Sequence, residues 1–212
     1  MAATHSLRAA LGPLPGTRMK RIHVLTAVAL ALPAVVTAQQ SAAPVQRPAN
    51  PVTESIRNIA GTYGGWLAAA FDSIPAGRYG FRPTPVQQSV GYIAQHLEGA
   101  NYALCQRIGG VTHPTGPKDA LADTVKALWP KDTLVARLRA SLLFCQDAFT
   151  RVDDSKMGDP VLSRRAGSTE TAPRARALGL FVTDLAEHYS QIAGYMRLMG
   201  IVPPSALRRP SR

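Results

Sequence analysis

Apolar residues recur at steps of three and four residues along four separate stretches of the chain. This spacing is the period of an amphipathic helix with one face turned to a core. In the first stretch Asn50, suited to cap a helix, precedes Pro51, and Pro75 ends the pattern. Three further stretches carry the same pattern, over residues 89–109, 132–149 and 174–199. The pattern therefore predicts four long helices.

The residues at the ends of these stretches support the same helices. Ser89 and Asp132 are suited to cap the second and third helices, and Gly109-Gly110 and Gly200 to end the second and fourth. A short helical segment is expected over residues 118–128, and residues 153–173 read as a long crossover or mobile loop. No segment shows sustained alternation of period two. The prediction is an all-α, up-down four-helix bundle with a long connection between the third and fourth helices.

The N-terminal segment has the pattern of a secretory signal peptide. Lys20 and Arg21 precede an apolar run over residues 24–36, and residues 36–38 (VTA) offer small side chains before a cleavage after Ala38. The run is broken by Pro33 and is too short to span a bilayer, so no stable membrane insertion is expected. The sequence predicts an exported protein, periplasmic or secreted.

These features divide the chain into four parts. Residues 1–38 form the signal peptide, with the true start expected at Met19 because residues 1–18 are an unusual prefix to such a leader. Residues 39–50 form a flexible tether, residues 51–206 the bundle, and residues 207–212 a basic tail.

The charge balance does not make this a nucleic-acid binder. The chain has 24 Lys and Arg residues against 13 Asp and Glu residues, a formal net charge of +11. Part of that excess belongs to the leader, and the rest is scattered or terminal. Nucleic-acid binding needs a basic face with interleaved aromatic residues or a reading helix, and neither is evident.

Polar residues that could do chemistry fall on two of the predicted helices. His96 lies on the second helix, and Asp184 and His188 lie one turn apart on one face of the fourth. Two imidazoles and a carboxylate, with a fourth position open, make the ligand set of catalytic zinc and related divalent sites. The alternatives are a hydrogen-bonded core histidine at position 96 and a surface salt bridge between Asp184 and His188. His113 lies in a Gly/Pro loop and is expected to be exposed to solvent.

A di-iron bundle is not expected. Such a site needs two Glu-x-x-His motifs, and neither Glu98 nor Glu187 is followed by a histidine at the third position. Both glutamates also fall on other helix faces than the three candidate ligands.

Two motifs at opposite ends of the bundle resemble the DinB-like (YfiT-like) superfamily. The first is residues 79–85 (YGFRPTP), followed by Ser89 and His96, and the second comprises residues 188–191 (HYSQ), 195–197 (YMR) and 200–204 (GIVPP). The resemblance implies a four-helix bundle with a long connection, often a homodimer. It also implies a metal site of three histidines, one on the second helix and an H-x-x-x-H pair on the fourth.

In this resemblance His96 and His188 match two of the ligands, and Asp184 stands where the family has the first histidine of the pair. Either Asp184 binds the metal, or metal binding was lost and Asp184 only orients His188. The resemblance implies a divalent metal, zinc first, with nickel, iron or manganese as alternatives. Gln191 and Tyr195 are expected to line the pocket, with core packing as the alternative role of Tyr195, and no catalytic base is assigned.

The family suggests a small-molecule substrate but not a particular reaction. Its members include thiol-dependent S-transferases and isomerases, and others described as metal-dependent hydrolases. The competing hypothesis is a non-catalytic bundle, ligand-binding or stress-related, whose His and Asp residues are structural.

The two cysteines are expected to pair. Cys105 and Cys145 lie at similar depth on the second and third helices, and export would place them where a disulfide persists. The alternative is two buried free thiols that act as small apolar residues.

Overall fold

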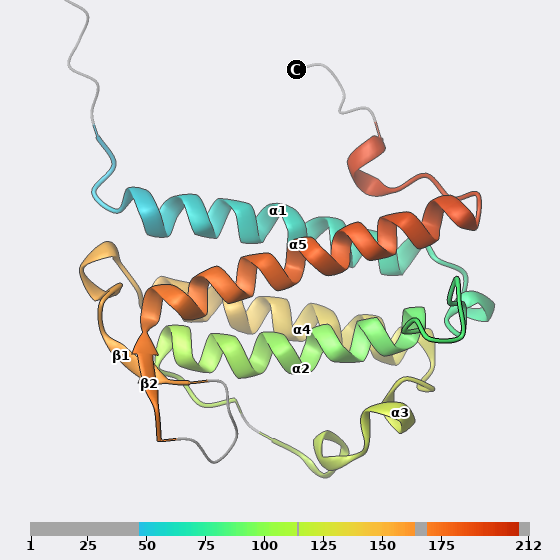
Figure 1. The fold of residues 1–212 in the computed structure, drawn as a ribbon, viewed down its shortest axis with the longest axis horizontal. Coiled ribbons are helices and arrows are strands. Elements are labelled where there is room, and N and C mark those ends of the chain that lie inside the picture. The colour runs from blue at the N-terminus through green and yellow to red at the C-terminus, as the bar shows by residue number, and fades with distance from the viewer. Residues whose placement is uncertain (1–46, 114, 164–168, 208–212) are drawn as a thin grey trace, which may run out of the picture. The chain divides into compact units, whose positions relative to one another are not determined.

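The computed structural model describes residues 47–113, 115–163 and 169–207, and these residues form a four-helix bundle. The four long helices of Figure 1 are α1 Pro51–Ser73, α2 Val90–Gly109, α4 Lys131–Thr150 and α5 Arg174–Leu198. The short helix α3, Asp123–Lys126, lies between α2 and α4, and the strands β1 Pro160–Leu162 and β2 Thr171–Pro173 lie between α4 and α5. The expected all-α bundle is confirmed. The expected signal peptide, residues 39–46 of the tether and residues 208–212 of the tail lie outside the described residues.

The residues predicted to begin α2 and to end α2 and α5 act as expected. The Ser89 hydroxyl accepts a hydrogen bond from Tyr92 N at 3.2 Å and so caps α2. Gly110 at φ 62° and Gly200 at φ 76° take the left-handed conformation that ends each helix, which glycine adopts without steric cost.

The start of α1 differs from the expectation. The Asn50 side chain makes no capping bond to α1 and instead accepts from Asp154 N at 3.2 Å. The Asp154 carboxylate accepts from Val52 N at 3.0 Å and Thr53 N at 2.7 Å. A residue a hundred positions away therefore satisfies the first amide groups of α1, which no local pattern could reveal. Asp132 is also not a cap, because α4 begins at Lys131 after Pro130.

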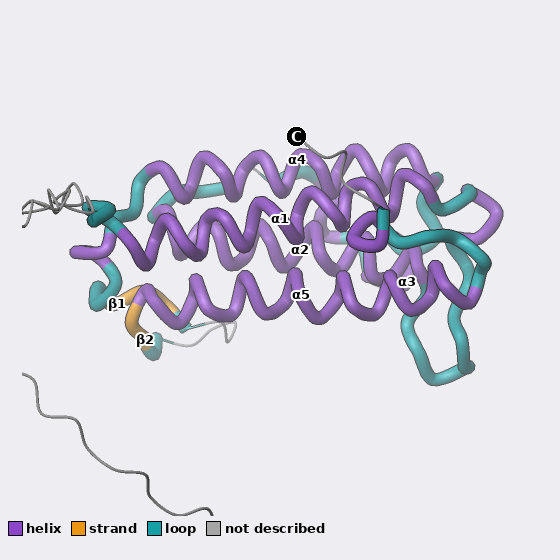
Figure 2. Tube along the Cα trace, turned by 90° about the horizontal axis from the view of Figure 1, so that it is seen from above, coloured by secondary structure: helices purple, strands orange, loops and turns teal. Residues whose placement is uncertain are grey.

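The helix directions differ from simple up-down alternation. Asn101 contacts Ser141 and Cys105 bonds Cys145, so α2 and α4 run parallel. Figure 1 shows α1 and α5 running together in the opposite direction. A parallel pair of consecutive long helices needs a connection that returns along the bundle. The connection between α2 and α4, which includes α3, supplies this return in Figure 1, and Figure 2 shows the four long helices of the same bundle from above.

The long connection before α5 is present, but it contains a short hairpin that the sequence did not predict. Val161 pairs with Ala172 in the antiparallel ladder of β1 and β2. Each strand has three residues, too few to show an alternating pattern. The hairpin lies beside the start of α5 (Figure 1).

The core lies along the bundle axis and is contributed by all four long helices. Its largest fully buried side chains include Leu67, Phe71, Ile93, Leu97, Leu138, Phe149, Leu178 and Phe181. Two residues of the expected apolar stripes are outside it, because Ile59 is 45% and Leu143 is 63% exposed. None of the described helices is both long and apolar enough to cross a membrane.

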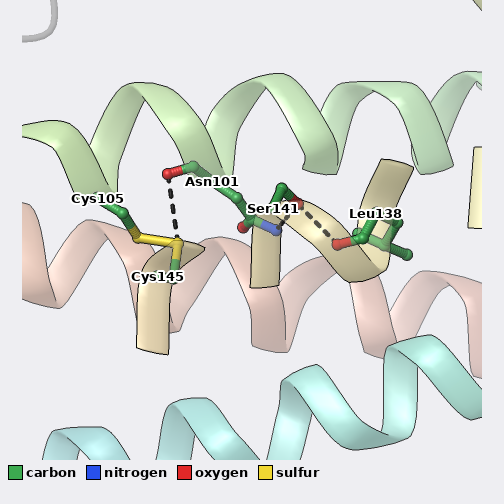
Figure 3. Close-up of a disulfide and its surroundings, with 5 residues drawn as sticks. All are labelled: Asn101, Cys105, Leu138, Ser141 and Cys145. Carbon is green, nitrogen blue, oxygen red and sulfur yellow. Dashed lines mark hydrogen bonds between the residues drawn. A yellow bond between two sulfur atoms is a disulfide. The ribbon is translucent and has the colours of Figure 1, made fainter. Parts of the chain in front are cut away.

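A disulfide joins α2 and α4, as expected from the two cysteines (Figure 3). The Cα atoms of Cys105 and Cys145 are 5.1 Å apart, and both residues are buried. One turn away, Asn101 Nδ2 donates to Ser141 Oγ at 2.9 Å, and Ser141 Oγ donates to Leu138 O at 2.8 Å. The α2–α4 contact is therefore fixed by a covalent bond and, one turn away, by a buried hydrogen bond between Asn101 and Ser141.

Candidate metal centre

Helices α2 and α5 bring the three candidate ligands to one place. His96 lies in the second turn of α2, and Asp184 and His188 lie in the middle of α5. The two helices run antiparallel, so the first half of α2 faces the second half of α5. The i,i+4 spacing then puts both α5 side chains beside His96.

The ligand atoms converge around the carboxylate. Asp184 Oδ1 lies 3.7 Å from His96 Nε2 and 3.6 Å from His188 Nε2. The imidazole centroids are 4.8 Å apart, with 68° between the ring planes. One ligand atom from each residue lies within 4.8 Å of the other two, close enough for the three to hold a metal ion.

Burial favours a cation at this position. The side chains of His188, Asp184 and His96 are 10%, 14% and 26% exposed, so the site is nearly closed at α5 and opens beside His96. Asp184 Oδ2 is buried and has no hydrogen-bond partner among the described residues. An unpaired buried carboxylate oxygen is costly unless a cation or donor satisfies it. The donor set, two imidazoles and one carboxylate, suits zinc and the other first-row divalent ions.

Neither simple alternative from the sequence describes the site fully. The Asp184–His188 pair is not a salt bridge on a solvated face, because both side chains are largely buried. His96 is not a solitary core histidine, since it faces an ionisable side chain and a second imidazole.

Gln191 and Tyr195 lie behind His188. His188 Nδ1 is 3.2 Å from Gln191 Oε1, and Gln191 Nε2 donates to Tyr195 OH at 3.0 Å. Tyr195 OH donates to Gln88 O at 3.1 Å, because a carbonyl oxygen can only accept. The Tyr195 hydroxyl therefore accepts from the Gln191 amide nitrogen, and the Gln191 amide oxygen faces His188. Nδ1 therefore carries the proton and donates to Gln191, which leaves the Nε2 lone pair turned toward the site. Such outer partners orient metal-binding histidines.

We expect Gln191→Ala to weaken metal binding roughly 10- to 100-fold, the usual effect of losing such a partner. Gln191→Glu keeps an acceptor for His188 Nδ1 and should restore most of the affinity. The measurement is competition with a chromogenic chelator. Gln146→Ala, at an exposed glutamine of α4, is the matched control. Equal affinities for the wild type and Gln191→Ala would contradict this role.

Three other residues considered in the sequence, His113, Glu98 and Glu187, lie outside the centre. His113 is not simply in solvent, since its ring stacks on Tyr102 with centroids 3.4 Å apart, and burial lowers the pKa of His113. Glu98 faces α4, as its helical phase predicts, and is 2.6 Å from Arg137 Nη2. Glu187 is exposed.

The sequence did not reveal the polar cluster formed by Glu98, Arg137, Asp119 and Trp129. Arg137 binds both carboxylates, and its guanidinium carbon lies 5.0 Å from the Trp129 ring centroid. The pKa of Asp119 is lowered, first by the Gly116 N–H and also by Arg137. The one signal for this cluster in the sequence was Glu98 on the buried side of α2, because a buried carboxylate requires a cation as its partner.

Comparison with known proteins agrees with this fold. The sequence profile of the DinB superfamily matches residues 64–192. A conserved protein from Enterococcus faecalis superposes with a TM-score of 0.52 at 15% identity, covering 69% of this chain and 95% of the other. A mycothiol-dependent maleylpyruvate isomerase superposes with a TM-score of 0.51 at 12% identity, covering 66% of this chain but only 59% of the isomerase. No curated protein sequence matches.

The fold and the site define a helical bundle with a candidate metal centre between its second and last long helices. The chain belongs to the DinB superfamily. The two solved structures support the fold alone, because their sequence identity to this chain is low.

Proposed function

We propose that this protein is an exported, metal-dependent enzyme that acts on a small molecule, and that His96, Asp184 and His188 hold its divalent metal. The observation that carries the proposal is the convergence of three ligand atoms around a carboxylate whose second oxygen is buried without a partner. Membership of the DinB superfamily supports the same position for the site.

Zinc is the metal that we propose first, with nickel, iron and manganese as alternatives. Such an ion lowers the pKa of a coordinated water or polarises a substrate oxygen. Asp184 supplies an anionic ligand where the DinB-like pattern has histidine, so the site carries less positive charge than a three-histidine site. Gln191 and Tyr195 hold His188 in the binding tautomer, and the more exposed His96 marks the side where a substrate enters.

Hydrolysis is the reaction that we favour over thiol-dependent transfer. Thiol cosubstrates are mainly cytosolic, whereas the leader pattern of residues 20–38 predicts export. The Cys105–Cys145 disulfide supports an oxidising compartment. The thiol dependence of the similar isomerase is a property of that protein and does not fit an exported one.

A non-catalytic binding protein is the second candidate function. It is favoured by the distances from Asp184 Oδ1 to the two imidazoles, which also suit an ionic network with a protonated histidine and no metal. In that case the three side chains would hold α2 against α5 without binding an ion.

Metal analysis of protein purified without a histidine tag separates the two functions. We expect near-stoichiometric metal in the wild type, almost none in His188→Ala, and undiminished metal in His113→Ala, which removes a histidine outside the centre. Asp184→Asn, which preserves shape, should also lose most of the metal. Circular dichroism establishes that each variant is folded. If zinc reconstitution leaves the wild type without metal, the enzyme proposal is wrong.

A further inference from the structure

An apolar groove lies between α1 and α4, on the side of the bundle opposite the α2–α5 contact that carries the candidate metal centre. The groove has a volume of about 520 Å³. It runs along α1 from Arg57 to Ala68, which corresponds to about 16 Å of helix. Its apolar lining includes Gly61, Gly64, Gly65, Leu142, Phe149 and Phe181.

The glycines of α1 explain why the groove is open. A Cβ atom at Gly64 would lie 3.1 Å from Leu142 Cδ2, so α1 touches α4 at that position. A Cβ at Gly61 or Gly65 would meet nothing within 4 Å. The missing side chains thus leave space beside the contact, and α1 packs less closely on α4 than on α5.

The lining has the character of a ligand site. Phe149 and Phe181 are almost fully buried, and their ring centroids are 5.7 Å apart. Leu143 lies on the same groove and is 63% exposed, so apolar surface continues to the rim. Binding sites for small molecules are commonly apolar hollows of this size with a few polar groups that orient the ligand.

An arginine stands at each end of the groove, and the two differ in their partners. Arg139 Nη2 is paired with Asp72 at 3.0 Å. Arg57 Nη2 donates to Phe149 O at 2.9 Å, and no carboxylate of the described residues pairs with it. One end of an apolar groove therefore carries an exposed cation that pairs with no carboxylate of the described residues. A guanidinium in this position matches a ligand carboxylate.

We infer that this groove binds a free long-chain carboxylate, with its apolar chain along Gly61 and Gly65 and its carboxylate at Arg57. The chain replaces the side chains that the glycines lack, and the headgroup supplies the anion that Arg57 lacks. This binding site is separate from the candidate metal centre, and the inference does not depend on whether metal binds there.

Calorimetry with dodecanoate and dodecanol, each below its micelle concentration, tests the inference on the purified protein. We expect saturable binding of one dodecanoate. Gly61→Leu with Gly65→Leu fills the groove and should abolish this binding, while leucine favours the helix. The matched control is Gly179→Leu, at a helical glycine of α5 whose Cβ would also meet nothing within 4 Å. Arg57→Gln should weaken dodecanoate about tenfold, the effect of losing one charged hydrogen bond, and leave dodecanol unchanged.

Four results would overturn the inference. The first is absence of saturable dodecanoate binding to the folded wild type. The second is binding that survives the double leucine variant or is lost equally in Gly179→Leu. The third is a wild-type dimer in sedimentation that dissociates in the double leucine variant, which would make a second copy of the chain the occupant. The fourth is equal affinity of Arg57→Gln and wild type for dodecanoate, because the carboxylate would then not lie at Arg57.

Discussion

Replacing both Cys105 and Cys145 by alanine is expected to lower the free energy of unfolding by about 4 kcal/mol. The bond connects residues 40 positions apart, so it removes much of the freedom of the unfolded chain. It also joins α2 and α4, two parallel helices whose connection returns along the bundle. Few contacts between residues close in sequence can therefore hold these helices together when the bond is absent. Urea denaturation of the oxidised wild type and the double variant measures the difference.

Two comparisons isolate the bond from the packing of the sulfur atoms. A reductant should destabilise the wild type and leave the double alanine variant unchanged. Ser141→Ala removes a buried hydrogen bond of the same α2–α4 contact and should cost only about 1 kcal/mol. Two free thiols in the denatured wild type would show that the pair is not oxidised, and the prediction would fail.

Arg137→Met is expected to lower the free energy of unfolding by about 3 kcal/mol, the low end of the cost of breaking a buried ion pair. Glu98 is only 5% exposed, and the substitution leaves its carboxylate buried without its cation. The low end applies because the Arg137 side chain is 26% exposed and partly screened by solvent. Thermal and urea unfolding give the measurement.

The matched control is Arg139→Met, on the same helix. Arg139 and Asp72 form an ion pair whose side chains are 53% and 57% exposed, so its loss should cost less than about 1 kcal/mol. Adding Glu98→Gln to Arg137→Met removes the isolated charge and should recover more than half of the lost stability. Equal effects of the two arginine substitutions would show that burial of Glu98 is not the cause.

The same substitution has a consequence for pH dependence. Because the pKa of Asp119 lies below its usual value in the folded protein, ionised Asp119 stabilises the fold above the unfolded pKa. That stabilisation is lost as the pH falls through the folded pKa. In Arg137→Met the pKa of Asp119 should rise only part of the way, since the Gly116 N–H is the larger cause and remains. NMR titration of the Asp119 carboxyl follows this change.

Local patterns were sufficient for the helices and for part of the site. Ser89, Gly110 and Gly200 act through bonds and backbone conformations within a few residues, so the sequence locates the ends of α2 and α5. The placement of Asp184 and His188 on one face follows from the helical period alone. That His96 faces them was a hypothesis from the residue types, which the family resemblance strengthened, because no local rule relates residues on different helices.

Other features depended on partners that are distant in the sequence. Asp154 caps α1 from across the fold, and Arg137 compensates Glu98 from another helix. The groove at Gly61 and Gly65 exists because of where α4 lies, and glycines alone do not predict a site. The parallel course of α2 and α4 was also not readable, because apolar periodicity has no direction.

By itself the sequence determined the four helices, most of the residues on each buried face and a short set of candidate ligands, because these follow from backbone geometry over a few residues. The tertiary structure alone decided which faces meet, that the carboxylate of Asp184 lies between two imidazoles with one oxygen unpaired, and where an apolar groove stays open. These properties arise from packing between segments far apart in the chain, where burial and charge compensation are set by neighbours that no local pattern specifies.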